Sequence, residues 1–148
     1  MDNQNFTTTI LVEQSAQKVF EAINNVSEWW QGKITGNSHQ LNDEFVYNMM
    51  DFYISKQKVI ELIPNKKVVW LITESNLTSF TNNTEWTGTK VIFEISELNG
   101  KTQMRFTHQG LVPKFQCYGD CSSAWSELVE KSLFSLITTG KGKKVFEV

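Results

Sequence analysis

The 148-residue sequence has few residues that break or crosslink a chain: two prolines, two cysteines and eight glycines. Hydrophobic residues make up 40% of it and aromatic residues 12%, which excludes a disordered or collagen-like chain. It has no basic excess, since its formal net charge is −2, so we expect no nucleic-acid partner. It also lacks a run of about 18 apolar residues, the length that a membrane-spanning helix needs. This length predicts one domain over residues 1–148.

Targeting signals and common catalytic motifs are also missing. The first five residues are polar and include Asp2, and neither the basic nor the apolar segment of a secretion signal follows. We therefore expect a cytoplasmic protein in which Cys117 and Cys121 are reduced thiols. No GxSxG, GxGxxG, GxxxxGKS/T or HExxH motif occurs. We accordingly predict no catalytic residues of these kinds, no cofactor and no metal site.

Alternating apolar and polar residues predict an antiparallel sheet. The alternation is clearest around the Asn99-Gly100 pair, which is typical of a tight hairpin turn. A less regular alternation in residues 53–63 indicates a bulge. The expected strands cover residues 6–12, 44–50, 53–63, 68–73, 90–97 and 101–108, with loops or strand edges at residues 33–35 and a polar loop at residues 76–87.

Apolar residues spaced by three and four predict helices near both ends of the chain. Ser15 is a candidate N-cap for a first helix, and Ser27 for a second, short one. A long helix over residues 121–139 is expected to end at Gly140. This last helix is the only predicted element large enough to cover one face of the sheet, so the fold class is α+β. A pocket is expected where the helix and the sheet do not fully interdigitate.

Several motifs match one family pattern along nearly the whole chain. They are Val19-Phe20-Glu21-Ala22-Ile23, Glu28-Trp29-Trp30, Asp43-Glu44-Phe45, Glu85-Trp86-Thr87-Gly88-Thr89, Phe106-Thr107-His108-Gln109-Gly110-Leu111 and Ser123-Ala124-Trp125. With them, the chain resembles the START-like, or SRPBCC, superfamily. Within it, the chain is most similar to the family of the C-terminal domain of the activator of the ninety-kilodalton heat-shock chaperone's ATPase.

This resemblance implies a helix-grip fold. In that fold, a curved antiparallel sheet of about six to seven strands wraps around a long C-terminal helix, and two short helices follow the first strand. The fold hosts carriers, enzymes, sensors and co-chaperone domains, so it does not specify an activity.

The inward-facing residues are the candidate lining of a cavity between the sheet and the C-terminal helix. Apolar and aromatic walls with a few polar groups are typical of sites for small hydrophobic molecules. Strand parity and aromatic content select Trp30, Phe45, Tyr47, Met49, Trp70, Phe93, Ile95, Met104, Phe106, His108, Trp125 and Leu128. Binding of a small hydrophobic ligand is therefore the first function we predict.

His108 leaves open a second function, that of an enzyme that uses the cavity. It is interpreted either as a core histidine held by a hydrogen-bond partner or as a polar group inside the cavity. As an acid or base in an enzyme it would need a nearby partner, for which Tyr47 and Glu74 are the candidates.

A third function is a co-chaperone-like protein–protein interaction module, which the family resemblance implies. It predicts an exposed apolar patch around Leu77, Phe80 and Trp86 in the polar loop. A homodimer also stays open. The spacing of Cys117 and Cys121 leaves two lesser alternatives to free thiols: a metal site with a histidine, and a reversible disulfide.

Overall fold

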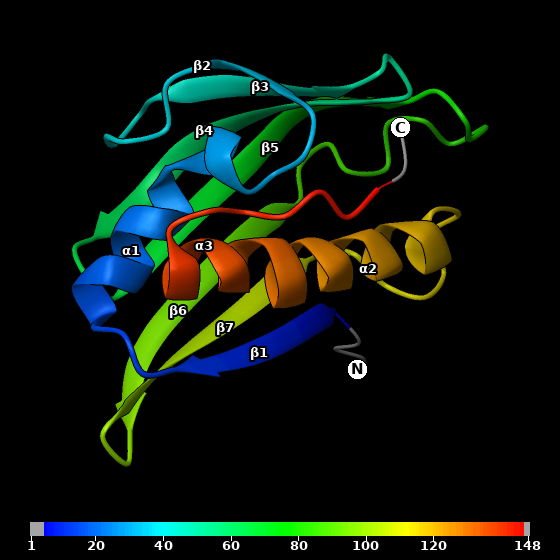
Figure 1. The fold of residues 1–148 in the computed structure, drawn as a ribbon. Coiled ribbons are helices and arrows are strands. Elements are labelled where there is room, and N and C mark those ends of the chain that lie inside the picture. Colours follow the sequence, from blue (N-terminus) through cyan, green and yellow to red (C-terminus); the bar gives the residue numbers. More distant parts are fainter. Residues whose placement is uncertain (1–4, 147–148) are drawn as a thin grey trace.

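The computed structural model describes residues 5–146 (Figure 1). The expectation of a cytoplasmic protein rests on the first five residues, of which the structure describes only Asn5. Seven strands form one antiparallel sheet in the order β1-β7-β6-β5-β4-β3-β2. The strands are β1 (Phe6–Val12), β2 (Lys33–Gly36), β3 (Glu44–Met49), β4 (Tyr53–Ile63), β5 (Lys67–Leu77), β6 (Lys90–Leu98) and β7 (Lys101–Gln109).

The alternation of the sequence predicts most of this sheet correctly. β1 and β4 begin and end at the predicted residues, and the register of β4 against β5 shifts at two points, as the irregular alternation indicates. Asn99 (φ 53°) and Gly100 (φ 81°) join β6 to β7. A two-residue hairpin turn of the favoured type needs this pair of positive φ angles.

One strand extends beyond its prediction. β5 continues to Leu77, whereas a loop is predicted from residue 76. The polar residues Glu74 and Asn76 point outward, while Leu77 is fully buried and lies opposite Tyr53 of β4. The polar composition of this segment therefore concealed a strand with one buried face.

The helices lie where the sequence predicts them, with small shifts at their ends. α1 (Ala16–Asn24) begins after Ser15, whose hydroxyl accepts a hydrogen bond from the Lys18 N–H at 3.2 Å. The second short helix is a single 3-10 turn, η1 (Val26–Glu28), that begins after Asn25 rather than Ser27. The C-terminal helix is a continuous 22-residue element that ends at Gly140 (φ 91°). It consists of α2 (Tyr118–Glu127), the π-helical η2 (Leu128–Leu133) and α3 (Phe134–Thr139).

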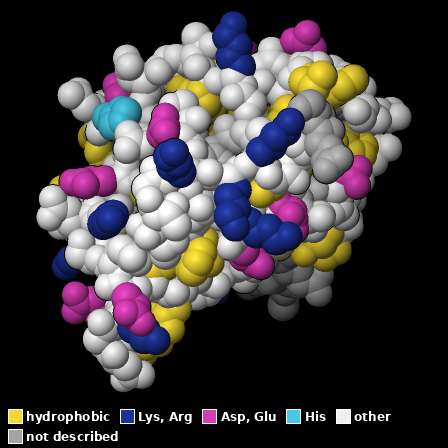
Figure 2. Space-filling model, in the orientation of Figure 1, with side chains coloured by type: hydrophobic (Ala, Val, Ile, Leu, Met, Phe, Trp, Pro, Cys, Tyr) yellow, Lys and Arg dark blue, Asp and Glu magenta, His cyan; other side chains and the backbone are white. Residues whose placement is uncertain are grey.

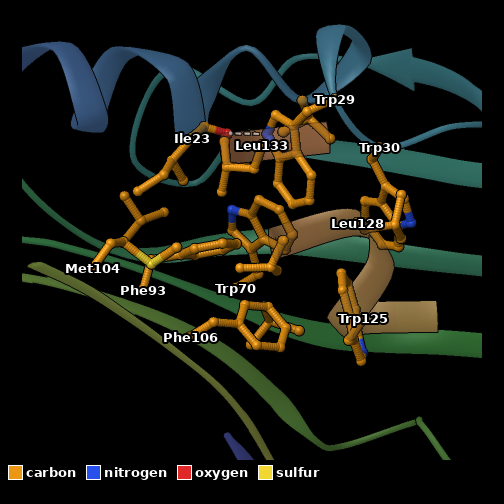
Figure 3. Close-up of a cluster of buried hydrophobic side chains, with 14 of the residues drawn as sticks. Ile23, Trp29, Trp30, Trp70, Phe93, Met104, Phe106, Trp125, Leu128 and Leu133 are labelled. Carbon is orange, nitrogen blue, oxygen red and sulfur yellow. Dashed lines mark hydrogen bonds between the residues drawn. The ribbon is translucent and has the colours of Figure 1, made fainter. Parts of the chain in front are cut away.

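The C-terminal helix lies across one face of the sheet, and α1 lies beside α3 (Figure 1). Between these layers is an aromatic core that includes Trp29, Trp70, Phe93 and Phe106 (Figure 3). Each fully buried large side chain contributes about 1.5–3 kcal/mol relative to an exposed one. The arrangement confirms the predicted α+β helix-grip fold. No helix within residues 5–146 combines the length and the apolar character needed to cross a membrane.

Candidate functional site

All twelve residues predicted to line the cavity are buried. The inward parity of the nine strand residues among them is therefore correct, but the twelve residues fall into two groups. Seven of them belong to the core between the sheet and the helix and are not part of the pocket described below: Phe45, Trp70, Phe93, Ile95, Met104, Phe106 and His108. Trp30, Tyr47, Met49, Trp125 and Leu128 lie where the core opens into a pocket.

The pocket has a volume of about 520 Å³ and lies between the N-terminal half of the C-terminal helix and the end of the sheet that carries the β3–β4 turn. The sheet side contributes Tyr47, Met49, Met50, Phe52 and Tyr53, and Trp30 and Trp86 come from connecting segments. The helix side contributes Asp120, Cys121, Ser123, Ala124, Trp125, Glu127 and Leu128, and the C-terminal segment adds Val145 and Phe146. Aromatic rings thus dominate the walls, and polar groups are few.

The floor of the pocket is a stack of rings that the backbone holds in place. The rings of Trp30 and Tyr47 lie parallel with their centres 4.0 Å apart. The Tyr47 hydroxyl donates to the Gln31 carbonyl at 2.7 Å. Gly32 (φ 143°) packs so closely on the Tyr47 ring that a Cβ at this position would overlap it. Burial raises the pKa of Tyr47 above its ordinary value near 10, so its hydroxyl stays protonated and acts as a donor.

His108 is fixed in a buried network beside the pocket. Its Nδ1 accepts the indole N–H of Trp125 at 3.0 Å, which places the ring proton on Nε2. Nε2–H donates to the Thr89 hydroxyl at 2.8 Å, and that hydroxyl donates to the Trp86 carbonyl. Burial lowers the pKa of His108 from 6.5 to about 3.

This network decides between the interpretations of His108. Both ring nitrogens are occupied, and neither of the predicted partners, Tyr47 and Glu74, is bonded to the ring. His108 is thus a core histidine that positions Trp125 in the pocket wall.

The two cysteines are not the reduced thiols that the sequence predicts. Cys117 and Cys121 are joined by a disulfide, with Cα atoms 5.5 Å apart. The helix begins at Tyr118, so Cys121 lies one turn beyond Cys117 and its N–H donates to the Cys117 carbonyl at 2.7 Å. This pairing is the disulfide that the spacing of the two residues leaves open as a lesser alternative to free thiols. Within residues 5–146, no three His, Cys, Asp or Glu side chains come together as a metal site.

The predicted apolar patch is not on the surface. Leu77 is fully buried and Trp86 is 6% exposed, while Phe80 is half-buried. Trp86 instead stacks on Trp125, with ring centres 5.8 Å apart, and lines the pocket. Its indole nitrogen is buried without a hydrogen-bond partner among the described residues.

The exposed hydrophobic side chains lie elsewhere. Met50 and Phe52, at the β3–β4 turn, are 58% and 53% exposed and form part of the pocket rim. On the face shown in Figure 2, hydrophobic side chains gather at the upper right, near this turn, and acidic and basic side chains surround them.

Residues 141–146 form a strap beside the pocket, which the sequence prediction missed. The Gln31 side-chain oxygen accepts the N–H groups of Val145 (2.7 Å) and Phe146 (2.9 Å), and its nitrogen donates to the Phe146 carbonyl at 2.9 Å. The Ser132 hydroxyl, on η2, accepts the Lys143 N–H at 3.1 Å. No periodicity marks this strap, because its hydrogen bonds are made by side chains distant in sequence.

Comparisons with known proteins identify the family. A family model described as "Activator of Hsp90 ATPase homolog 1-like protein" matches residues 13–137. The chain belongs to this family. The resemblance seen in the sequence motifs is thereby confirmed. No curated protein matches the sequence of this AHSA1-like chain.

Solved structures support the same assignment. The Aha1 dimer from Colwellia psychrerythraea is 25% identical, with a TM-score of 0.74, and the match covers 93% of this chain and 98% of that one. Mll3558 from Rhizobium loti is 12% identical (TM-score 0.71; 92% and 97% covered), and SSP2350 from Staphylococcus saprophyticus is 11% identical (TM-score 0.67; 96% and 97% covered). The last two show that the fold is shared and say nothing about activity.

Proposed function

We propose that this AHSA1-like domain binds a small hydrophobic molecule in the pocket between the sheet and α2. The observation that carries the proposal is the aromatic-walled pocket of about 520 Å³. Sites for small molecules are usually apolar clefts of roughly 300–1,000 Å³ with a few polar groups. Trp86 contributes its indole ring to the pocket wall, while the indole nitrogen stays buried.

Filling the pocket tests this function. Ala124 lines the pocket from α2, so Ala124→Phe places a ring in the space that the ligand would occupy. We expect the mutant to bind the neutral fluorescent probe N-phenyl-1-naphthylamine at least about tenfold more weakly, because a site filled by a side chain cannot also hold the probe. A fluorescence titration measures both dissociation constants.

Ser122→Phe is the matched control. Ser122 lies on the same helix but does not line the pocket, so this mutant should bind like the wild type. Near-ultraviolet circular dichroism checks that both mutants keep the aromatic core. Equal binding by Ala124→Phe and the wild type, or no saturable binding by the wild type, would overturn the proposal.

A protein–protein interaction module is the second candidate. The family description, which refers to an activator of the Hsp90 ATPase, and the dimer formed by the Colwellia protein favour it. The exposed Met50 and Phe52 provide an apolar surface for a partner. If this candidate is right, adding the domain to an Hsp90 chaperone should change its ATPase rate, and Met50→Ser should reduce the change. An unchanged ATPase rate at a saturating concentration of the domain would rule out this candidate.

A further inference from the structure

The chemistry of the pocket walls says which class of hydrophobic molecule fits, if the proposed function holds. The rings of Trp30, Tyr47, Trp86 and Trp125 line the pocket together. Aromatic faces attract cations through their negative quadrupole, and the attraction grows when the cation loses water. A ring face that opens to the pocket therefore favours a positive group over a negative one; Trp30 and Tyr47 cover one face of each other by stacking, as do Trp86 and Trp125.

The only charged side chains among the described lining residues are carboxylates. Asp120 and Glu127 stand two turns apart on α2 and border the pocket. Glu127 pairs with Lys131 at 3.0 Å, so part of its charge is already balanced. Asp120 has no ion pair among residues 5–146.

The negative charge of Asp120 influences a residue of the pocket wall, Tyr53. Burial raises the pKa of Tyr53, and the negative charge of Asp120 raises it further. Tyr53 is itself part of the pocket wall, so the carboxylate lies close enough to influence a group placed there.

Basic side chains are absent from the described lining. Lys141, Lys143 and Lys144 lie in the strap, but all three are exposed and none lines the pocket. An anionic ligand such as a fatty acid would thus meet two carboxylates and no described cation. Charge complementarity favours the opposite sign.

From these walls we infer that the ligand is an amphiphilic organic cation: an ammonium-type head, placed between the aromatic rings and Asp120, on an apolar body. This inference rests on the proposed function and narrows it to one ligand class.

Three probes with the same ten-carbon chain test the ligand class: decyltrimethylammonium, decanol and decyl sulfate, each below its micelle-forming concentration. Binding is followed by tryptophan fluorescence, since three tryptophans line the pocket. We expect the cation to bind at least about tenfold more tightly than the sulfate. Asp120→Asn should weaken binding of the cation about three- to tenfold and leave decanol within about twofold.

Glu97→Gln is the matched control, because it removes one negative charge from an exposed position on β6, away from the pocket lining. It should leave all three affinities unchanged. Equal effects of the two mutations would show that only net charge matters and would overturn the inference. So would a decanol or sulfate probe that binds as tightly as the cation, although the proposed function would then stand. If none of the three probes binds, the proposed function fails as well.

Discussion

At the scale of single residues, His108 shows how one buried polar side chain is kept neutral. The indole N–H of Trp125 and the hydroxyl of Thr89 occupy its two ring nitrogens, and Trp86 packs edge-on against the ring at 4.8 Å. A proton added to Nδ1 would face the Trp125 donor and lose that hydrogen bond. Burial and bonding therefore both oppose protonation.

This environment predicts how stability depends on pH. In the unfolded chain His108 titrates near 6.5, whereas in the folded protein its pKa is lowered to about 3. Between these values the unfolded state binds more protons, so the stability that the neutral ring provides is complete above pH 6.5 and falls as the pH drops toward 3. The expected loss is up to about 1.4 kcal/mol per pH unit within this window. Urea unfolding at several pH values between 7 and 4 measures it.

His108→Gln provides the comparison, because glutamine can form hydrogen bonds but does not titrate. Relative to the wild type, its free energy of unfolding should depend less on pH below 6.5. If the free energy of unfolding changes equally with pH in the two proteins, protonation of His108 does not affect folding, which would contradict the prediction.

At the scale of elements, the strap over residues 141–146 connects the end of the C-terminal helix to the pocket. Gln31 holds it by three hydrogen bonds through one side chain, and the backbone carbonyl of the same residue accepts from Tyr47 in the pocket floor. Gly142 passes so close to the Glu28 carbonyl that a Cβ there would overlap it. Gln31 thus anchors both the strap and the pocket floor.

Gln31→Leu should release the strap without unfolding the domain. The N–H groups of Val145 and Phe146 lose their acceptor, so their hydrogen exchange should speed up by at least about tenfold, in line with the loss of about 1.5 kcal/mol of local stability. Nuclear magnetic resonance at the two amides measures this. Gly142→Ala should have a similar effect, because the added Cβ displaces the strap.

Gln17→Leu is the control, since Gln17 forms only an exposed hydrogen bond with Glu21 within α1. It should leave the two amides protected. Unchanged exchange in Gln31→Leu would mean that the strap is held by packing of Phe146 rather than by Gln31.

At the scale of the whole molecule, the sequence specifies the fold more fully than it specifies the site. Alternation in residues 90–108 and the Asn99-Gly100 turn predict β6, β7 and their hairpin, and the apolar spacing predicts the C-terminal helix. Each of these patterns is local, so the sequence alone carries it. Parity also identifies the buried side of β3, β6 and β7 correctly.

Local patterns cannot tell which buried residues reach the pocket. Phe93 and Trp125 are both buried, but Phe93 packs against Trp70 in the core, whereas Trp125 lines the pocket. Trp86 and Phe146 reach the pocket from segments without periodicity. Their positions depend on contacts between distant parts of the chain, and for Trp86 the matching family motif was the one available signal.

The five tryptophans offer the most direct test that a ligand occupies this pocket. Trp30, Trp86 and Trp125 line it, whereas Trp29 and Trp70 lie in the core behind it. Indole N–H resonances, assigned by single Trp→Phe mutants, can be followed during titration with decyltrimethylammonium or N-phenyl-1-naphthylamine. We predict saturable shifts that are large for Trp30, Trp86 and Trp125 and small for Trp29 and Trp70. No saturable shift in the first three, or larger shifts in Trp29 and Trp70, would contradict binding in the pocket.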